Sequence, residues 1–130
     1  MMQEIFKFKT IAVVGCSNNP SRPSYYVSEY MQNMGYKIVP VNPGHSHILG
    51  EACYPKLSAI PHKIDTVLIF RQVEFVPEIV QEAIKIGAKA IWMQDSIYDS
   101  KSGQKAQDAG LMVVMDDCMM RVHQNQILGR

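Results

Sequence analysis

The chain has 130 residues, of which 47% are hydrophobic and 19% charged, and a formal net charge of +1. These values are typical of a single globular domain over residues 1–130 that buries about two-thirds of the surface of its unfolded chain. The nearly balanced charge, without any basic run, gives no support for a nucleic acid or a membrane surface as partner. No segment approaches the roughly 18 apolar residues of a transmembrane helix, and residues 1–10 lack the apolar core of a signal peptide.

Cysteines and histidines give no sign of a disulfide framework or a metal site. Cys16, Cys53 and Cys118 are odd in number and widely spaced, which predicts a reducing, cytoplasmic setting. His45 and His47 lie in a polar loop without convergent cysteine or aspartate, so we expect them to be solvated and expect no metal.

Strands and helices are predicted to alternate along the chain. Apolar runs indicate five main strands, at residues 10–15, 36–41, 65–70, 89–93 and 111–115. Helical spacing with proline starts and glycine ends indicates helices from Pro23 to Gly35 and from Pro77 to Gly87. A third helix is expected from Asp99 or Ser100 to Gly110, and a short one after Asp117. Residues 53–54 are expected to form a short edge strand, and residues 57–60 a short turn of helix.

This alternation predicts an α/β protein with a three-layer Rossmann-like fold. We expect a parallel five-stranded sheet, with order 3-2-1-4-5 in main-strand numbering and helices on both faces. Ligands of such sheets bind outside the carboxyl ends of the strands, where the strand order reverses. Strand one and the strand ending at Phe70 are expected to flank that crevice. The Gly15 loop, Asn42-Pro43-Gly44, Phe70-Arg71 and the Gln94 region are expected to converge there.

The loop after the first strand, residues 15–25, has the composition of a phosphate site. Gly15 allows the backbone to turn sharply and approach a ligand, and Ser17, Asn18 and Ser21 supply short donors. Cys16 lies in the same loop. It can act as a small loop residue or form a mixed disulfide with a thiol ligand, and we favour the first.

Arg22 is the predicted N-cap of the following helix. Pro23 suits the first helical position and pushes Arg22 out of the α region. Because arginine has no side-chain acceptor, the N–H groups near Ser24 and Tyr25 are expected to lack a partner. An anion would satisfy both these groups and the guanidinium. A water-capped helix beside a solvated arginine is the alternative.

The loop does not match an NAD site. Ser17 and Pro20 interrupt the G-x-G-x-x-G pattern, and the second strand ends in Val41-Asn42 without a carboxylate for the ribose. An arginine at the phosphate loop suits a ligand with an extra phosphate, which means NADP or coenzyme A.

Motifs in characteristic order run through residues 9–123: Gly15-x-Ser17-x-x-Pro20-x-Arg22-Pro23-Ser24-Tyr25, Val39-Pro40-Val41-Asn42-Pro43, Phe70-Arg71, Gly87-Ala88-Lys89-Ala90-x-Trp92-x-Gln94 and Asp116-x-Cys118. Together they resemble the small stand-alone coenzyme A-binding proteins. That family is similar to the N-terminal coenzyme A-binding domain of the succinyl-CoA synthetase α-subunit, but lacks the domain that carries that enzyme's phosphohistidine.

The resemblance implies a role for each matching position. Those that would hold the ligand's phosphates are Gly15, Ser17 and Arg22. The adenosine half would be bordered by Val41, Asn42 and Pro43. The pantetheine arm would run beside Phe70 and Arg71, with Trp92 and Gln94 at the end of the fourth strand. The family commonly continues Gln-x-Gly, whereas here Gln94 is followed by Asp95 and Ser96, so a side chain stands where bare backbone is usual.

Other candidates for chemistry have simpler interpretations. Trp92 is more typical of a core residue than of a stacking platform. Cys118 is expected to be a buried thiol, since no base can be paired with it. Asp116 and Asp117 are expected to cap the next helix rather than act as paired acids.

These observations predict a protein that binds coenzyme A or an acyl-CoA without catalysis of its own. The predicted binding residues are Gly15, Cys16, Ser17, Asn18, Arg22, Ser24, Val41, Asn42, Pro43, Phe70, Arg71, Trp92 and Gln94. One alternative is an NADP-dependent oxidoreductase, although no Tyr-Lys or His-Asp set is evident. Another is a regulatory subunit that docks on a larger acyl-CoA enzyme.

Overall fold

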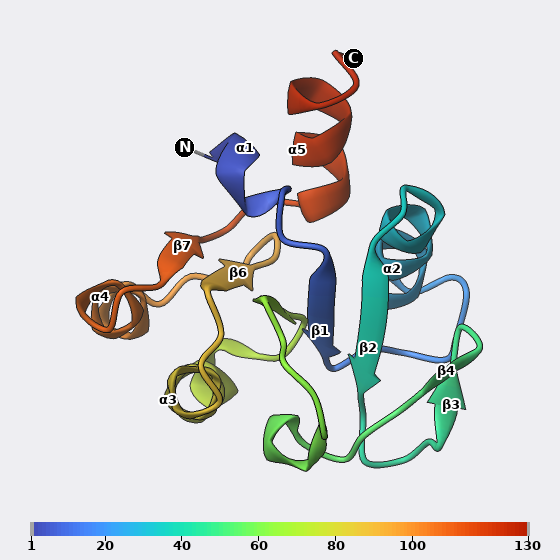
Figure 1. Cartoon of the computed structure of the whole chain (residues 1–130), viewed down its shortest axis with the longest axis horizontal. Coiled ribbons are helices and arrows are strands. Elements are labelled where there is room, and N and C mark those ends of the chain that lie inside the picture. The colour runs from blue at the N-terminus through green and yellow to red at the C-terminus, as the bar shows by residue number, and fades with distance from the viewer. Residues whose placement is uncertain (1, 130) are drawn as a thin grey trace.

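A parallel sheet forms the middle of the molecule, with helices on both of its faces (Figure 1). The computed structural model describes residues 2–129. Its five-stranded sheet consists of β1 (Thr10–Val14), β2 (Lys37–Val41), β5 (Thr66–Ile69), β6 (Ala90–Met93) and β7 (Met112–Val114). The helices are α1 (Met2–Ile5), α2 (Pro23–Asn33), α3 (Val76–Lys85), α4 (Ser100–Asp108) and α5 (Met119–Gln126). The predicted α/β Rossmann-like fold is confirmed.

The strand order is β2-β1-β5-β6-β7. Counted over the five main strands this is 2-1-3-4-5, so the expected order 3-2-1-4-5 is corrected in one respect. The third main strand, β5, pairs with β1, with Ile11 opposite Thr66 and Val14 opposite Ile69. The place outside β2 is taken instead by the predicted edge segment, which makes a single parallel bridge between Val41 and Tyr54. β1 and the strand ending at Phe70, which were expected to flank the ligand crevice, are thus direct neighbours in the sheet.

Short elements account for the other differences. The structure adds α1, the two-residue strands β3 (His47–Ile48) and β4 (Glu51–Ala52), and the short 3-10 helix η2 (Val73–Phe75). The expected turn of helix at residues 57–60 is η1 (Leu57–Ala59). A periodic pattern cannot be detected over two to four residues, which is why sequence analysis missed the added elements.

Alternate residues of each strand face opposite layers of helices. Ile11, Val13, Leu68 and Trp92 pack with α1, α2 and α5. Ala12, Val14, Ile69 and Met93 pack with α3 and α4. Both faces of the sheet are therefore covered by helices and shielded from water. This explains why the strands consist of continuous apolar runs instead of alternating apolar and polar residues. In the described part of the chain, no helix combines the length and hydropathy needed to span a membrane.

His123 is a buried polar side chain on α5, only 3% exposed. Its Nδ1 lies 2.7 Å from the Tyr30 hydroxyl, and the rings of Phe6, Tyr30 and Tyr36 contact it edge-on. Burial, together with the charge of Lys9, lowers the pKa of His123 below the usual 6.5. The imidazole is therefore neutral in the folded protein at neutral pH.

We expect the free energy of unfolding to fall as the pH drops below about 6.5, because unfolded His123 takes up a proton before the folded side chain does. Above that pH the contribution is constant. Each unit by which the pKa is lowered corresponds to about 1.4 kcal/mol. Denaturant unfolding measured from about pH 7.5 to about pH 5.5 should show this decrease in the free energy of unfolding, and His123→Phe should reduce its slope. His62→Gln, at an exposed histidine, is the matched control, and an equal slope in all three proteins would contradict the assignment.

Candidate functional site

Gly15 forms the turn at the carboxyl end of β1, with φ of +87°. Its N–H donates to the Val41 carbonyl at 3.0 Å, and the Phe70 N–H donates to the Val14 carbonyl at 2.9 Å. A Cβ atom at this position would lie 2.6 Å from the Phe70 carbonyl oxygen and 2.9 Å from Cδ of Arg71. Only glycine therefore allows this turn to lie against the end of β5.

The loop from Cys16 to Ser21 is held by its own hydrogen bonds. The Ser17 N–H donates to Oγ of Ser24 at 2.8 Å, and Oγ of Ser17 accepts from the Asn19 N–H at 3.0 Å. Oδ1 of Asn19 accepts from the N–H and hydroxyl of Ser21 at 3.0 and 2.9 Å. These contacts set the loop's shape before any ligand arrives.

The start of α2 has the predicted capping. Arg22 is the N-cap, with extended φ and ψ of −87° and 141°, no side-chain capping bond, and Pro23 after it. One detail of the prediction was wrong: the Tyr25 N–H donates to the Arg22 carbonyl at 3.0 Å and is not open. Within residues 2–129, the N–H groups of Asn18 and Ser24 have no hydrogen-bond partner.

Arg22 and Arg71 have no carboxylate partner in the described chain. Arg71 lies against the Gly15 turn, whereas Arg22 stands at the start of α2 and lines neither groove described below. Arg22 is exposed, whereas Arg71 is half-buried with its guanidinium 4.2 Å from the centroid of the Phe75 ring. Two arginines without carboxylate partners, one of them two residues before the unpaired Ser24 N–H, make this end of the sheet favourable for anions.

A groove of about 750 Å³ lies beside this turn, and we call it the β2 groove. Five predicted residues border it, namely Gly15, Val41, Asn42, Pro43 and Arg71. Lys56 and Ser58 near η1 and Glu78, Ile79 and Glu82 on α3 form its other wall. The prediction missed this wall, although α3 follows β5 and must therefore begin at the carboxyl edge of the sheet.

Asn42 links the β2 groove to the loop of residues 15–25. Its Nδ2 donates to the Cys16 carbonyl at 2.9 Å, and its Oδ1 accepts from the Gly44 N–H at 2.9 Å. Both ends of the side chain are thus used within the protein. Asn42 positions the loop and the turn after β2, while its face borders the groove.

A second groove, of about 470 Å³, lies on the other side of the crevice between α2 and α5. We call it the α5 groove. Of the predicted residues it contains Phe70 and Gln94. Its remaining lining includes Tyr26, Ile97 and Met120, which sequence reasoning missed because they come from three separate segments.

Gln94 is 5% exposed and holds the start of α5. Its Oε1 accepts from the Met119 N–H at 3.1 Å. The expected capping by Asp116 and Asp117 is therefore corrected: Cys118 is the N-cap without a side-chain capping bond, and Gln94 satisfies the first helical amide. Asp117 instead accepts from the Cys118 N–H at 3.0 Å.

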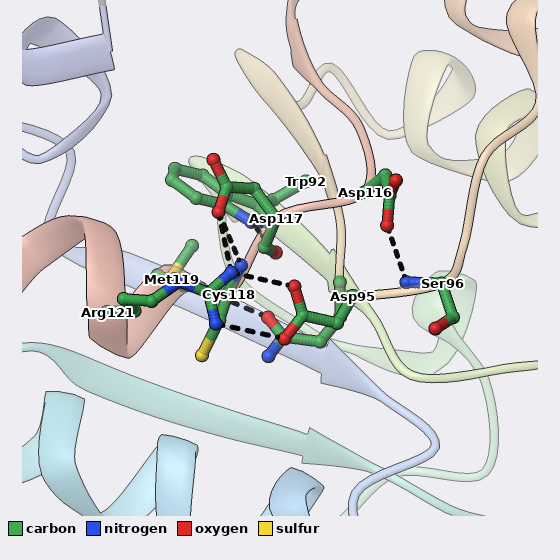
Figure 2. Close-up of polar contacts among 9 residues, drawn as sticks. Trp92, Asp95, Ser96, Asp116, Asp117, Cys118, Met119 and Arg121 are labelled. Carbon is green, nitrogen blue, oxygen red and sulfur yellow. Dashed lines mark hydrogen bonds and ion pairs between the residues drawn. The ribbon is translucent and has the colours of Figure 1, made fainter.

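Figure 2 shows Asp95 and Asp117 converging on Arg121. The guanidinium donates to the two oxygens of Asp95 at 3.2 and 2.8 Å, and to Oδ1 of Asp117 at 2.9 Å. The hydrogen bonds from Arg121 hold the pKa of the Asp95 carboxyl below its usual range. To one side, the Ser96 N–H donates to Oδ1 of Asp116 at 2.7 Å.

Two predicted binding residues lie below the surface of the crevice. Trp92 is fully buried, and its Nε1 donates to the Asp117 carbonyl at 2.9 Å. Cys16 is also fully buried, with its thiol against the Ser24 carbonyl and the Ser28 hydroxyl, and burial raises the pKa of the thiol to about 11. Neither side chain lines a groove. Their assignment to the site stays a prediction.

His45 and His47 are both exposed. In residues 2–129, no three His, Cys, Asp or Glu side chains are grouped as metal ligands would be.

Known proteins resemble this chain along most of its length. An uncharacterized protein of Bacillus subtilis, YneT, is 37% identical over 115 residues, which is 88% of this chain and 85% of YneT. A hypothetical protein from Pyrococcus horikoshii, of known structure, superposes with a TM-score of 0.92 at 39% identity, covering 97% of this chain and 89% of that one.

One larger relative is an ADP-forming acetate–CoA ligase II of Archaeoglobus fulgidus. It is 31% identical over 106 residues, which is 80% of this chain and only 16% of the ligase. The sequence profile described as the CoA binding domain matches residues 9–124. The chain therefore belongs to the CoA binding domain family.

Proposed function

We propose that this chain binds coenzyme A or an acyl-CoA in the crevice at the carboxyl ends of its strands, and has no catalysis of its own. The observation that carries the proposal is the loop from Gly15 to Ser24, which has two unpaired N–H groups, Arg22 at the start of α2 and Arg71 against the Gly15 turn, both arginines without carboxylate partners within residues 2–129. This arrangement suits the phosphates of coenzyme A. Family membership supports the same ligand.

The two grooves suit the two ends of such a ligand. The β2 groove, bordered by Val41 and Pro43, is open to the adenosine half. Phe70 and Arg71 are consecutive, yet Phe70 lines the α5 groove and Arg71 the β2 groove. A pantetheine arm that leaves the phosphate loop across this pair would enter the α5 groove.

No observation favours the alternative function, that of an NADP-dependent oxidoreductase. The Asn42 side chain at the end of β2 makes its hydrogen bonds within the protein. Docking on a larger acyl-CoA enzyme stays a prediction, suggested by the length of the ligases to which the chain is similar, and a pull-down with and without coenzyme A would test it.

Calorimetry should show that coenzyme A binds at least about tenfold more tightly than NADP or NAD, a difference of about 1.4 kcal/mol. The physical reason is the match of separate phosphate and pantetheine regions to the loop and the α5 groove. Mass spectrometry of ligand released from freshly purified protein gives an independent check. Tighter binding of NADP would overturn the proposal.

Arg22→Ala should weaken the binding of coenzyme A by roughly tenfold to over a hundredfold, because a charge-assisted hydrogen bond contributes about 1.5–3 kcal/mol. Lys63→Ala is the matched control. Lys63 is exposed and precedes β5, at the opposite edge of the sheet. If both variants bind like the unchanged protein, Arg22 is only a solvated surface charge.

The protein should release no free thiol from acetyl-CoA or succinyl-CoA above background. Thioester hydrolysis needs a positioned base and an activated nucleophile or water. Asp95 is the carboxylate nearest in sequence to the end of β6, and Arg121 binds both of its oxygens. Turnover that disappears in both Asp95→Ala and Ser96→Ala would show a catalytic site and defeat the binding-only function.

A further inference from the structure

The α5 groove has apolar walls from four elements of the chain. Tyr26 and Val27 come from α2, Phe70 follows β5, Ile97 follows β6, and Met120 belongs to α5. Its volume of about 470 Å³ lies within the range of about 300–1,000 Å³ that is typical of small-molecule pockets. The groove is therefore large enough to hold a short acyl chain with the end of a pantetheine arm.

One polar group of this groove, on the largely buried side chain of Gln94, has no hydrogen-bond partner in the described chain. Because Oε1 of Gln94 accepts from the Met119 N–H, the other end of the amide is Nε2, which donates. Nε2 has no partner in the described chain, although the residue is only 5% exposed and lines the groove. An unpartnered donor at such a site suits a carbonyl oxygen of the ligand.

The rim of the groove carries an excess of negative charge. Arg121 binds two carboxylates, Asp95 and Asp117, so its guanidinium is already paired (Figure 2). A ligand carboxylate at this rim would lose hydration and be repelled by the carboxylates of Asp95 and Asp117. The cation beside it, Arg121, is already paired with both, so binding of the carboxylate would be unfavourable. An uncharged acyl chain meets only the apolar walls.

We propose that the α5 groove receives the acyl group of an acyl-CoA, with Nε2 of Gln94 donating to the thioester carbonyl, and that it selects an uncharged chain over one that ends in a carboxylate. This inference rests on the proposed binding of coenzyme A. It adds the substrate class, which that function leaves open.

Calorimetry with coenzyme A, butyryl-CoA and succinyl-CoA tests the proposal, because both acyl groups have a four-carbon chain. Butyryl-CoA should bind about tenfold more tightly than coenzyme A, since burial of apolar methylenes favours it. It should exceed succinyl-CoA by at least the same factor. Equal or tighter binding of succinyl-CoA, or no gain of butyryl-CoA over coenzyme A, would overturn the acyl pocket while leaving coenzyme A binding intact.

Two variants sharpen the assignment. Met120→Trp fills the groove and should abolish the preference for butyryl-CoA over coenzyme A. Asp95→Asn removes one carboxylate from Arg121 and should raise the affinity for succinyl-CoA relative to butyryl-CoA by about threefold or more. Asp108→Asn, on α4 and outside both grooves, is the matched control and should bind all three ligands like the unchanged protein.

Failure of the proposed function gives a different result. If none of the three ligands binds, the coenzyme A site and the acyl pocket are both wrong. If all bind but the preference persists in Met120→Trp, the acyl group lies elsewhere and the inference fails alone. If Met120→Trp does not fold, the ratio of the affinities for butyryl-CoA and succinyl-CoA, compared between the unchanged protein and Asp95→Asn, still tests the acyl pocket.

Discussion

The close approach of the Gly15 turn to the end of β5 is the constraint on which the crevice depends. With a Cβ atom 2.6 Å from the Phe70 carbonyl, β1 and β5 could not end side by side as they do. The neighbouring ends of these strands bring the loop of residues 15–25, which follows β1, against the Phe70-Arg71 pair, which follows β5. The same contact separates the β2 groove from the α5 groove. The absence of a side chain at Gly15 therefore fixes where the ends of β1 and β5 meet between the two grooves.

Charge is divided unequally along that path. Arg22 and Arg71 have no carboxylate partners in the described chain, whereas Arg121 at the far end has two. The first region can therefore gain a charge-assisted contact when an anion binds. The second has already used its positive charge within the protein. This division of charge matches the proposed ligand, because an acyl-CoA with an apolar chain is anionic at one end and uncharged at the other.

Local patterns were sufficient for the long elements and for the start of α2. Pro23 after Arg22 indicated an N-cap without an acceptor, and the structure has this cap. The burial of Trp92 also follows from the continuous apolar run of residues 90–93, which is typical of a strand covered on both faces. The strand order could not be predicted in the same way, because local sequence does not show on which side of β1 and β2 the chain places the next main strand, β5. The contacts of Arg121 with Asp95 and Asp117 were not predicted either, because Asp95 lies 26 residues away from Arg121 in the chain.

Ser96 stands where the family commonly has the glycine of Gln-x-Gly, and its backbone still has a conformation that favours glycine. Hydrogen bonds connect Asp95 and Ser96 to other segments. Ser96 has φ of 69° and Asp116 has φ of 56°, both in the left-handed region that favours glycine. That conformation costs a non-glycine residue about 1–2 kcal/mol. The hydrogen bond from the Ser96 N–H to Asp116 offsets part of this cost, while Asp95 is tied to Arg121 on α5. The segment after β6 is thus joined through Ser96 to the loop after β7, and through Asp95 to α5. Because these segments form one wall of the α5 groove, the substituted residues hold that wall in place rather than block the crevice.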